Sequence, residues 1–283
     1  MKRKALIVDG HNFLFRGFYG VPDQVKRKDG THINAVYGFF SLLRTISKTI
    51  NFDYLIVVFD SETAANNKKI SRPEYKANRL PQNNSIFFQL DLIKKSLDIL
   101  GIQWVEHATI EADDVIGIYS QQLAGKGIHV HICSNDFDFI QLISPEISVI
   151  RGYHGEVVFF DEKRVAERFS IHPSQYVDFI SLPGDASDNI KGIKGIGKKR
   201  AANLLSQYGN IQKIYQSIDF FSPSLKKLLQ EHEDFLLKQK KFLAIQKNQK
   251  LLSKLNIKSI VFLGNKIPEK MGAFLDLNWG KLI

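Results

Sequence analysis

The sequence predicts an α/β fold, in which a central, mainly parallel sheet is flanked by helices and followed by a helical region. Three short apolar runs, residues 5–8, 54–59 and 128–133, lead into acidic segments and have the length and composition of buried strands. Between them, residues 39–50 and 90–100 carry apolar side chains three and four positions apart, as amphipathic helices do. This alternation of strand and helix is typical of a parallel sheet.

A hairpin and several helices are predicted after the third strand. Residues 147–151 and 156–160 have the pattern of two short strands, and residues 152–155 would form the turn between them. Helical segments are predicted at 162–169, 173–182, 198–207 and 224–247. We therefore expect an α/β core over residues 1–170 and a helical region over residues 171–283.

Composition and terminal patterns limit the class of protein. A chain of 283 residues with 44% hydrophobic content can bury a substantial core. The single cysteine, Cys133, excludes an internal disulfide and a CxxC zinc site. Only four apolar residues separate the basic start of the chain from Asp9, and no apolar run reaches membrane-spanning length. We expect a cytoplasmic protein without membrane contact.

The charge is unevenly distributed along the chain. There are 39 Lys and Arg against 29 Asp and Glu, which gives a formal net charge of +10. Residues 191–254 alone hold 14 basic and 4 acidic side chains, so the whole excess lies there. Such a regional excess indicates a face that binds a polyanion, with a solvated lysine-rich surface as the plain alternative.

Acidic residues follow the predicted strands. In open parallel sheets, ligands bind outside the carboxyl ends of the strands, and Asp9, Asp60, Asp136 and Asp138 fall at that edge. Two more acidic motifs, residues 111–114 and 185–188, are each more typical of a helix start or a turn when taken alone. Together they give nine acids that the sheet would gather: Asp9, Asp60, Glu111, Asp113, Asp114, Asp136, Asp138, Asp185 and Asp188.

Such a cluster is predicted to bind divalent cations. Two unit charges ~4 Å apart repel by ~1 kcal/mol even in water, so closely spaced carboxylates need cations between them. Oxygen ligands without cysteine or an ordered histidine set favour Mg²⁺, with Mn²⁺ as a substitute, over zinc. Two such ions can activate water and stabilise the leaving oxygen in phosphodiester hydrolysis.

Competing motifs are weaker. Residues 192–199 approach a P-loop, but Lys199 stands where Ser or Thr is required and no buried strand precedes the segment. His129 and His131 alternate on one strand face, which favours packing over metal ligation. No GxSxG or HExxH motif is present.

The acidic motifs and several others occur in the order and spacing of a known family. The chain resembles the 5′ nuclease domain of bacterial DNA polymerase I, phage 5′ exonucleases and cellular flap endonucleases. The resemblance covers essentially the whole chain and ends in a segment, 273–282, that looks like the usual end of that domain. The matching motifs are residues 8–11, 35–39, 57–60, 75–79, 111–115, 135–138 and 184–189.

The resemblance implies a PIN-like, Rossmann-like nuclease core and a divalent-metal-dependent 5′-3′ exodeoxyribonuclease and flap endonuclease. Such an enzyme hydrolyses DNA at 5′ ends and 5′-flap junctions by a two-metal mechanism and leaves 5′-phosphate and 3′-hydroxyl ends. The family places Glu111, Asp113, Asp136 and Asp138 around one ion. Asp185 and Asp188 join for the second, and the remaining three acids complete the cluster.

The resemblance also implies a helix-hairpin-helix at about residues 185–207, which holds duplex DNA without reading its sequence. Its glycines, Gly195 and Gly197, would let the backbone approach a phosphate, and K⁺ can bind there. Positive charge would come from the start of the following helix, at Lys198, Lys199 and Arg200. An ordinary glycine turn between packed helices is the alternative.

Residues 62–85 correspond to the family's arch, under or through which a single strand passes. Lys76 and Arg79 match residues that contact the scissile phosphate, so they are assigned to catalysis. Arg72 adds positive charge, and Tyr75 would stack on a base or else cover the sheet edge. Arg16 and Phe13 would touch DNA or be structural.

Two departures from the family pattern stand out. Asn135 replaces an Ala found in many relatives and would tune metal affinity, whereas residues 64–71 match the arch poorly and leave threading open. The expected partners are branched, nicked or flapped DNA, including RNA–DNA primers, and a separate DNA polymerase, with the chain itself a monomer. A PIN-like ribonuclease and a non-enzymatic DNA-binding module are the rival hypotheses.

Overall fold

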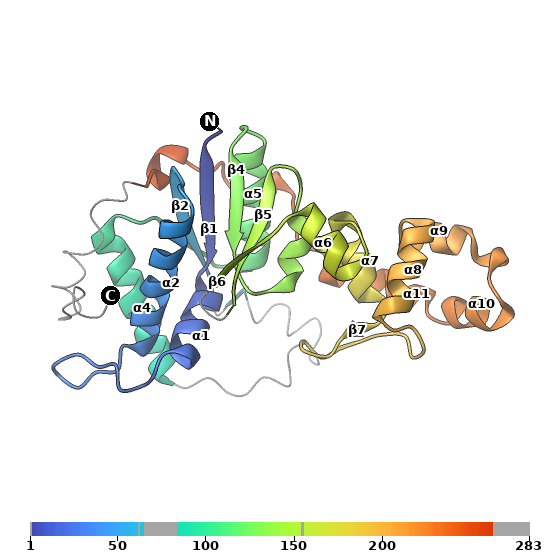
Figure 1. The fold of residues 1–283 in the computed structure, drawn as a ribbon, viewed down its shortest axis with the longest axis horizontal. Coiled ribbons are helices and arrows are strands. Elements are labelled where there is room, and N and C mark those ends of the chain that lie inside the picture. Colours follow the sequence, from blue (N-terminus) through green and yellow to red (C-terminus); the bar gives the residue numbers. More distant parts are fainter. Residues whose placement is uncertain (1, 62, 65–83, 154–155, 263–283) are drawn as a thin grey trace.

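A single mixed sheet forms the centre of the molecule. The computed structural model describes residues 2–61, 63–64, 84–153 and 156–262. Its six strands lie in the order β3-β2-β1-β4-β5-β6 (Figure 1), and every neighbouring pair is parallel except β5 and β6. The strands are β1 (Lys4–Asp9), β2 (Tyr54–Asp60), β3 (Trp104–His107), β4 (His129–Cys133), β5 (Ile147–Tyr153) and β6 (Glu156–Phe160). The predicted mainly parallel sheet is confirmed.

The two faces of the sheet bury different side chains of the same strands. Leu6 and Val8 of β1 point into one apolar cluster, and Ala5 and Ile7 point into the other, as the two-residue period of a strand requires. Both faces are buried, which explains why the strands read as continuous apolar runs. The first cluster includes side chains of α1 (Gly10–Gly20), α2 (Asn34–Thr49) and α4 (Asn84–Leu100), and the second includes those of α5 (Ala112–Ala124).

Helices α1 and α2 cross at two glycines. A Cβ atom on Gly38 would lie 2.3 Å from the Cα of Gly17, so neither position has room for a side chain. This close crossing holds α1 against the sheet. Since α1 begins at Gly10, directly after β1, the crossing also fixes the backbone that follows Asp9.

The helical region extends from one side of the sheet, with α8 to α11 farthest from it (Figure 1). It consists of short helices and a two-stranded hairpin, whose bounds are α6 (Glu162–Phe169), α7 (Tyr176–Ser181), β7 (Gly184–Asp185), β8 (Ile190–Lys191), α8 (Lys198–Tyr208), α9 (Ile211–Gln216), α10 (Pro223–Gln230) and α11 (Glu233–Leu243). Within the described part of the chain, no helix is long and apolar enough to span a membrane.

Three elements differ from the sequence-based expectation. Strand β3 was not predicted, because three of its four residues are half-buried and one is exposed, with Glu106 and His107 among the apolar ones. The helix expected at 224–247 is two helices, α10 and α11, since residues 230–234 are all polar and offer nothing to bury across the break. Acidic residues in the first turn of α11 then favour a new helix start there.

The predicted turn between two DNA-binding helices is longer than expected. Helix α8 begins at Lys198, as predicted, but the preceding helix, α7, ends at Ser181. The hairpin of β7 and β8 and a turn through Gly195 lie between them. The glycine turn therefore joins a strand to a helix, and α7 and α8 flank the whole connection.

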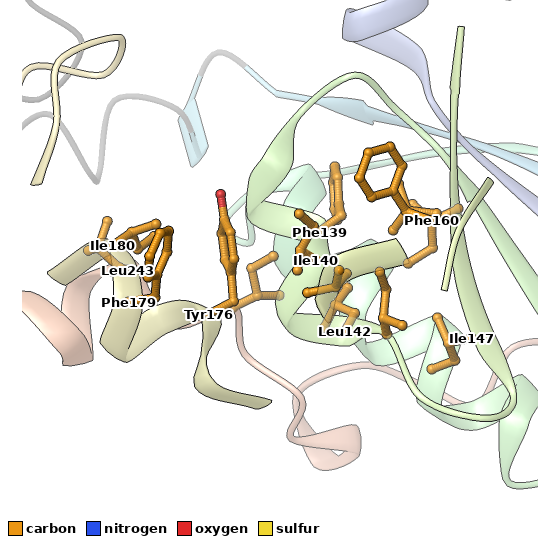
Figure 2. Packing of buried hydrophobic residues seen from close by; sticks show 14 of the residues in the cluster. Phe139, Ile140, Leu142, Ile147, Phe160, Tyr176, Phe179, Ile180 and Leu243 are labelled. Atoms are coloured by element: carbon orange, nitrogen blue, oxygen red, sulfur yellow. The ribbon is translucent and has the colours of Figure 1, made fainter. Parts of the chain in front are cut away.

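The core and the helical region share one apolar cluster. Figure 2 shows Phe139, Ile140 and Phe160 of the core in a continuous layer with Phe179 and Leu243 of the helical region. After α11 the chain returns to the core, where residues 244–262 pack on α5 and β2. The two predicted regions are therefore joined by burial and by the returning chain.

Candidate metal centre and DNA interface

The predicted acids come to the carboxyl edge of the sheet from separate elements. Asp9 ends β1 beside Val58 of β2, and Asp60 ends β2. After β4, Asp136 is the N-cap residue of a short 3-10 helix, η1 (Phe137–Leu142), and Asp138 lies in its first turn. Glu111 is the N-cap residue of α5, and Asp113 lies in its first turn.

A chain of hydrogen bonds links three of these acids. The Asp9 carboxylate accepts the Ser134 hydroxyl at 2.7 Å and the Asn12 N–H at 3.0 Å. The Ser134 oxygen in turn accepts the N–H of Asp136 at 3.0 Å, and the Asp136 carboxylate accepts the N–H of Asp138 at 2.8 Å. Ser134 therefore fixes the orientation of Asp9 relative to η1.

Asp60 and His11 position the start of α5. The Asp60 carboxylate accepts the N–H of Ala112 at 2.8 Å, and the Asp60 N–H donates to Nδ1 of His11 at 3.0 Å. Burial lowers the pKa of His11 to about 4, so the ring is neutral at pH 7 and can accept this bond. These contacts hold the first turn of α5, which carries Asp113, beside the sheet edge.

The electrostatics of Asp9 show that the acids face one another. Burial raises the pKa of Asp9 to about 8, and repulsion from Asp113 and then from Asp60 contributes further. The hydrogen bonds from Ser134 and Asn12 oppose this shift without cancelling it. A cation beside Asp9 would favour the ionised carboxylate instead.

Tyr176 connects the acids of the sheet edge to those of the helical region. Its ring is buried in the shared apolar cluster, and its hydroxyl points away from the labelled apolar side chains (Figure 2). Burial raises the pKa of Tyr176, and Asp138, Asp136 and Asp185 raise it further. Asp185, on β7, therefore lies on the same side of the tyrosine as the two acids of η1.

The other two acids are placed differently. Asp114 is turned toward the returning chain, because its carboxylate accepts the N–H of Gln246 at 2.8 Å. Asp188 is buried in the hairpin between β7 and β8, one residue before Asn189, whose φ of 56° is left-handed. Asp113 and Asp60 thus act electrostatically on Asp9, and Asp138, Asp136 and Asp185 act on Tyr176, while Asp114 has a separate structural contact.

The donor set suits a hard divalent cation. Within the described residues, no three His, Cys, Asp or Glu side chains are grouped closely enough to hold a metal ion. The predicted acids nevertheless suit a divalent metal ion chemically, because their donor atoms are carboxylate oxygens. A cation would also relieve the repulsion between Asp9 and the neighbouring acids. Binding an ion would require side-chain rotation that draws these oxygens together.

The predicted DNA-contacting residues of α8 are exposed. Lys198, Lys199 and Arg200 occupy its first turn, where the helix dipole favours an anion. Gly195 has a φ of 95°, which a glycine adopts readily, and its carbonyl accepts a hydrogen bond from Arg200 at 3.1 Å. Gly197 is the N-cap residue.

The remaining predicted contacts divide into two groups. Arg16 is a partly buried residue of α1, with its Cζ 5.7 Å from the centroid of the Phe13 ring, and burial lowers its pKa. Phe13 is fully buried, which settles it as a core residue. Four predicted residues, Arg72, Tyr75, Lys76 and Arg79, lie outside the described residues, as does most of the predicted arch.

Sequence reasoning missed three residues that shape this site. Ser134 could have been found from its place between the end of β4 and Asp136, where a hydroxyl often bonds the next turn. His11 lies two residues after the first acid. Tyr176 had no local signal, because only the packing of α7 against η1 brings its hydroxyl to the acids.

Two family models match most of the chain. The model described as "5'-3' exonuclease, N-terminal resolvase-like domain" matches residues 4–170, and "5'-3' exonuclease, C-terminal SAM fold" matches residues 171–261. The chain belongs to the 5′-3′ exonuclease family. Members of this family are nucleases, so the predicted family and the predicted class of enzyme are confirmed.

Relatives of this 5′-3′ exonuclease include separate nucleases and polymerase domains. A 5'-3' exonuclease of Aquifex aeolicus is 36% identical over 215 residues, which cover 76% of this chain and 73% of the relative. The thermostable DNA polymerase I of Thermus thermophilus is 32% identical over 286 residues, which cover 100% of this chain. The chain spans about a third of the length of that polymerase, 33%.

Solved structures of similar fold include nucleases from a phage. The T5 D15 protein crystallised with metal ions has a TM-score of 0.70 at 21% identity, covering 88% of this exonuclease and 90% of the T5 chain. A T5 D15 flap endonuclease complex with DNA and metal ions has a TM-score of 0.69 at 20% identity, covering 97% and 98%. These likenesses confirm the predicted fold class.

Proposed function

We propose that this exonuclease-family chain is a structure-specific nuclease that hydrolyses DNA phosphodiesters at 5′ ends and 5′-flap junctions, leaving 5′-phosphate and 3′-hydroxyl ends. The observation that supports this most is the meeting of carboxylates from β1, β2, α5 and η1 at one edge of the sheet, beside a basic helical region. The α/β core, residues 1–170, would supply the chemistry, and the helical region, residues 171–283, would supply most of the DNA contacts.

The nine predicted acids would hold two Mg²⁺ ions, for which Mn²⁺ would substitute. Asp9, Asp113, Asp136, Asp138 and Asp185 are the strongest candidates, which is supported by the electrostatic effect of Asp113 on Asp9 and of the other three acids on Tyr176. When bound, the ions would supply the positive charge that activates water and stabilises the leaving oxygen. A second proposed cation, K⁺, would lie at the turn before α8.

The chain's own residues would prepare the edge for this chemistry. Ser134 and Asn12 hold Asp9 in one orientation, and neutral His11 holds the backbone of Asp60. The exposed cations at the start of α8 would bind duplex phosphates without reading bases. Lys76 and Arg79 would stabilise charge on the scissile phosphate.

The names of the relatives support the wider setting. A similar sequence forms part of DNA polymerase I, and the T5 D15 structure is a complex with DNA and metal ions. We therefore propose action on branched, nicked or flapped DNA, including RNA–DNA primers, as a cytoplasmic monomer working beside a separate polymerase.

The direct test is cleavage of a 5′-flap DNA that is labelled at either end. The chain should cut near the junction with Mg²⁺ or Mn²⁺ and should not cut with EDTA, while a blunt duplex of the same sequence serves as the matched control. The labels identify which product carries the 5′-phosphate. Tight flap binding with no cutting in either metal would contradict the proposal and favour a DNA-binding module.

A further inference from the structure

An arginine beside the acidic edge lies against aromatic rings and forms no hydrogen bond with the residues that the structure describes. Arg151 lies near the end of β5, and its Cζ is 3.4 Å from the centroid of the Phe137 ring and 5.8 Å from that of Phe160. Within the described residues, no hydrogen bond or ion pair involves this side chain, and its Nη1 atom is buried. A buried donor without a partner loses its hydrogen bonds to water, so this arrangement is unfavourable unless a ligand or packing compensates it.

A second arginine increases the positive charge at the same place. Arg168, in the last turn of α6, has its Cζ 5.1 Å from the centroid of the same Phe137 ring. In the described part of the chain no carboxylate forms an ion pair with either arginine, whereas Arg164 on the same helix lies 3.9 Å from Glu167. Burial lowers the pKa of Arg151 to about 10, and repulsion from Arg168 contributes, but the Arg151 guanidinium stays charged at pH 7.

The pair lies at the flank of the acidic edge. The backbone of Gly152, next to Arg151, exchanges two hydrogen bonds of 3.1 Å with the Asn135 side chain, which directly precedes Asp136. Asp136 and Tyr176 both act electrostatically on Arg151. Positive charge is thus held beside the carboxylates without being neutralised by them.

We propose that Arg151 and Arg168 form a phosphate-binding site for a backbone phosphodiester of the DNA substrate. A guanidinium group matches the oxygens of a phosphate in a two-pronged geometry, and a phosphate would neutralise both charges at once. This inference rests on the proposed function, because the site would add a contact that positions the DNA for the proposed cleavage. Neither arginine belongs to the predicted DNA-binding set.

The first experiment compares Arg151→Met, Arg168→Met and the control Arg164→Met. Methionine keeps most of the apolar contact area and removes the charge. Flap-DNA affinity in EDTA should fall about tenfold in the first two variants. The slope of log affinity against log salt should become shallower by ~0.7–0.9, the change expected for the loss of one phosphate contact. Arg164→Met should bind within about twofold of wild type, and Arg151→Lys should recover part of the loss because it keeps a point charge.

The second experiment identifies the phosphate. In a series of flaps, each carrying one neutral methylphosphonate, a single position should weaken wild-type binding yet leave Arg151→Met unaffected. The proposal would be overturned if each methylphosphonate position weakened the binding of Arg151→Met equally. It would also be overturned if Arg151→Met and Arg168→Met both bound the flap with wild-type affinity. If Arg151→Met unfolds, the exposed Arg168→Met carries the test alone. Wild-type cleavage of the same flap is measured in parallel, so failure of the proposed function is seen separately.

Discussion

The acidic edge of the sheet and the basic start of α8 hold their charges in opposite ways. Asp9 is 9% exposed, and its carboxylate accepts two hydrogen bonds that fix its direction. Lys198 and Lys199 are exposed, and no hydrogen bond or ion pair in the described residues restrains them. Asp9 is therefore held in one orientation, whereas the two lysines are exposed and unrestrained by the residues that the structure describes.

This difference matches two different physical tasks. Charges that stabilise a reaction must be fixed before the substrate arrives, because reorganising them would add to the barrier. Charges that attract a DNA backbone gain from reach and from counterion release, and they need no fixed orientation. The comparison predicts that changes at the sheet edge affect the rate of cleavage, whereas changes at α8 affect affinity and its dependence on salt.

The strongest test of this division is Asp136→Asn. The substitution keeps the shape of the side chain but removes a charge from the hydrogen-bonded group that includes Asp9 and Asp138. Loss of such preorganised electrostatic stabilisation lowers cleavage on the order of 10²–10³-fold. Single-turnover cleavage and flap binding in EDTA should be measured together, with Asp219→Asn, an exposed acid on the helical region, as the control. Equal loss of binding and cleavage would break the comparison.

A second test concerns the rigidity of the sheet itself. His131 is buried on β4, where its Nδ1 lies 2.7 Å from the Ser148 hydroxyl, and burial lowers its pKa to about 4. The unfolded chain binds a proton near pH 6.5, so stability is fully present above that pH and is lost as the pH falls toward 4. The loss reaches about 3 kcal/mol.

Urea unfolding at pH 7.5, 6 and 5 would measure this loss. The double variant His131→Leu with Ser148→Ala should show a shallower dependence on pH, whereas the exposed His172→Gln should keep the wild-type slope. An unchanged slope in the double variant would show that His131 binds protons equally well in the folded and unfolded chains, which contradicts this prediction.

A smaller effect is expected at α8. Changing Lys198 and Lys199 to Gln should reduce the slope of log affinity against log salt by about two and weaken binding ~10-fold at moderate salt. The cleavage rate at saturating enzyme should stay near that of wild type. Lys2→Gln with Lys163→Gln removes the same charge from the α/β core and is the control. An unchanged salt slope in the α8 variant would exclude this helix as the docking surface.

The sequence predicted the parts of the molecule that depend on local pattern. The strands that end at Asp9 and Asp60 are buried on both faces, so their apolar runs were unambiguous. Strand β3 was missed because three half-buried residues and one exposed residue give no clear period. The long helix expected at 224–247 was wrong because the positions of α10 and α11 depend on what each buries.

The candidate site was predictable only as a set of acids. Their common edge follows from the parallel direction of the strands, which the alternation of strands and helices already implied. The orientation of each side chain does not follow from it. Asp114 was expected with the others, yet its carboxylate accepts the N–H of Gln246, a contact made only because the chain returns across α5.

The smallest predicted effect is at Asn135, where the family pattern suggested a change that tunes the metal site. In the structure, its side-chain amide exchanges two hydrogen bonds with the backbone of Gly152, so it ties η1 to β5. Asn135→Ala should therefore lower the free energy of unfolding by about 1 kcal/mol while cleavage and metal dependence change little. Thermal unfolding and a Mg²⁺ titration of the cleavage rate would separate the two effects. If the Mg²⁺ requirement shifts while stability does not, Asn135 acts on the acids directly. Asn135 would then belong to the acidic edge of the sheet and would not serve only to join η1 to β5.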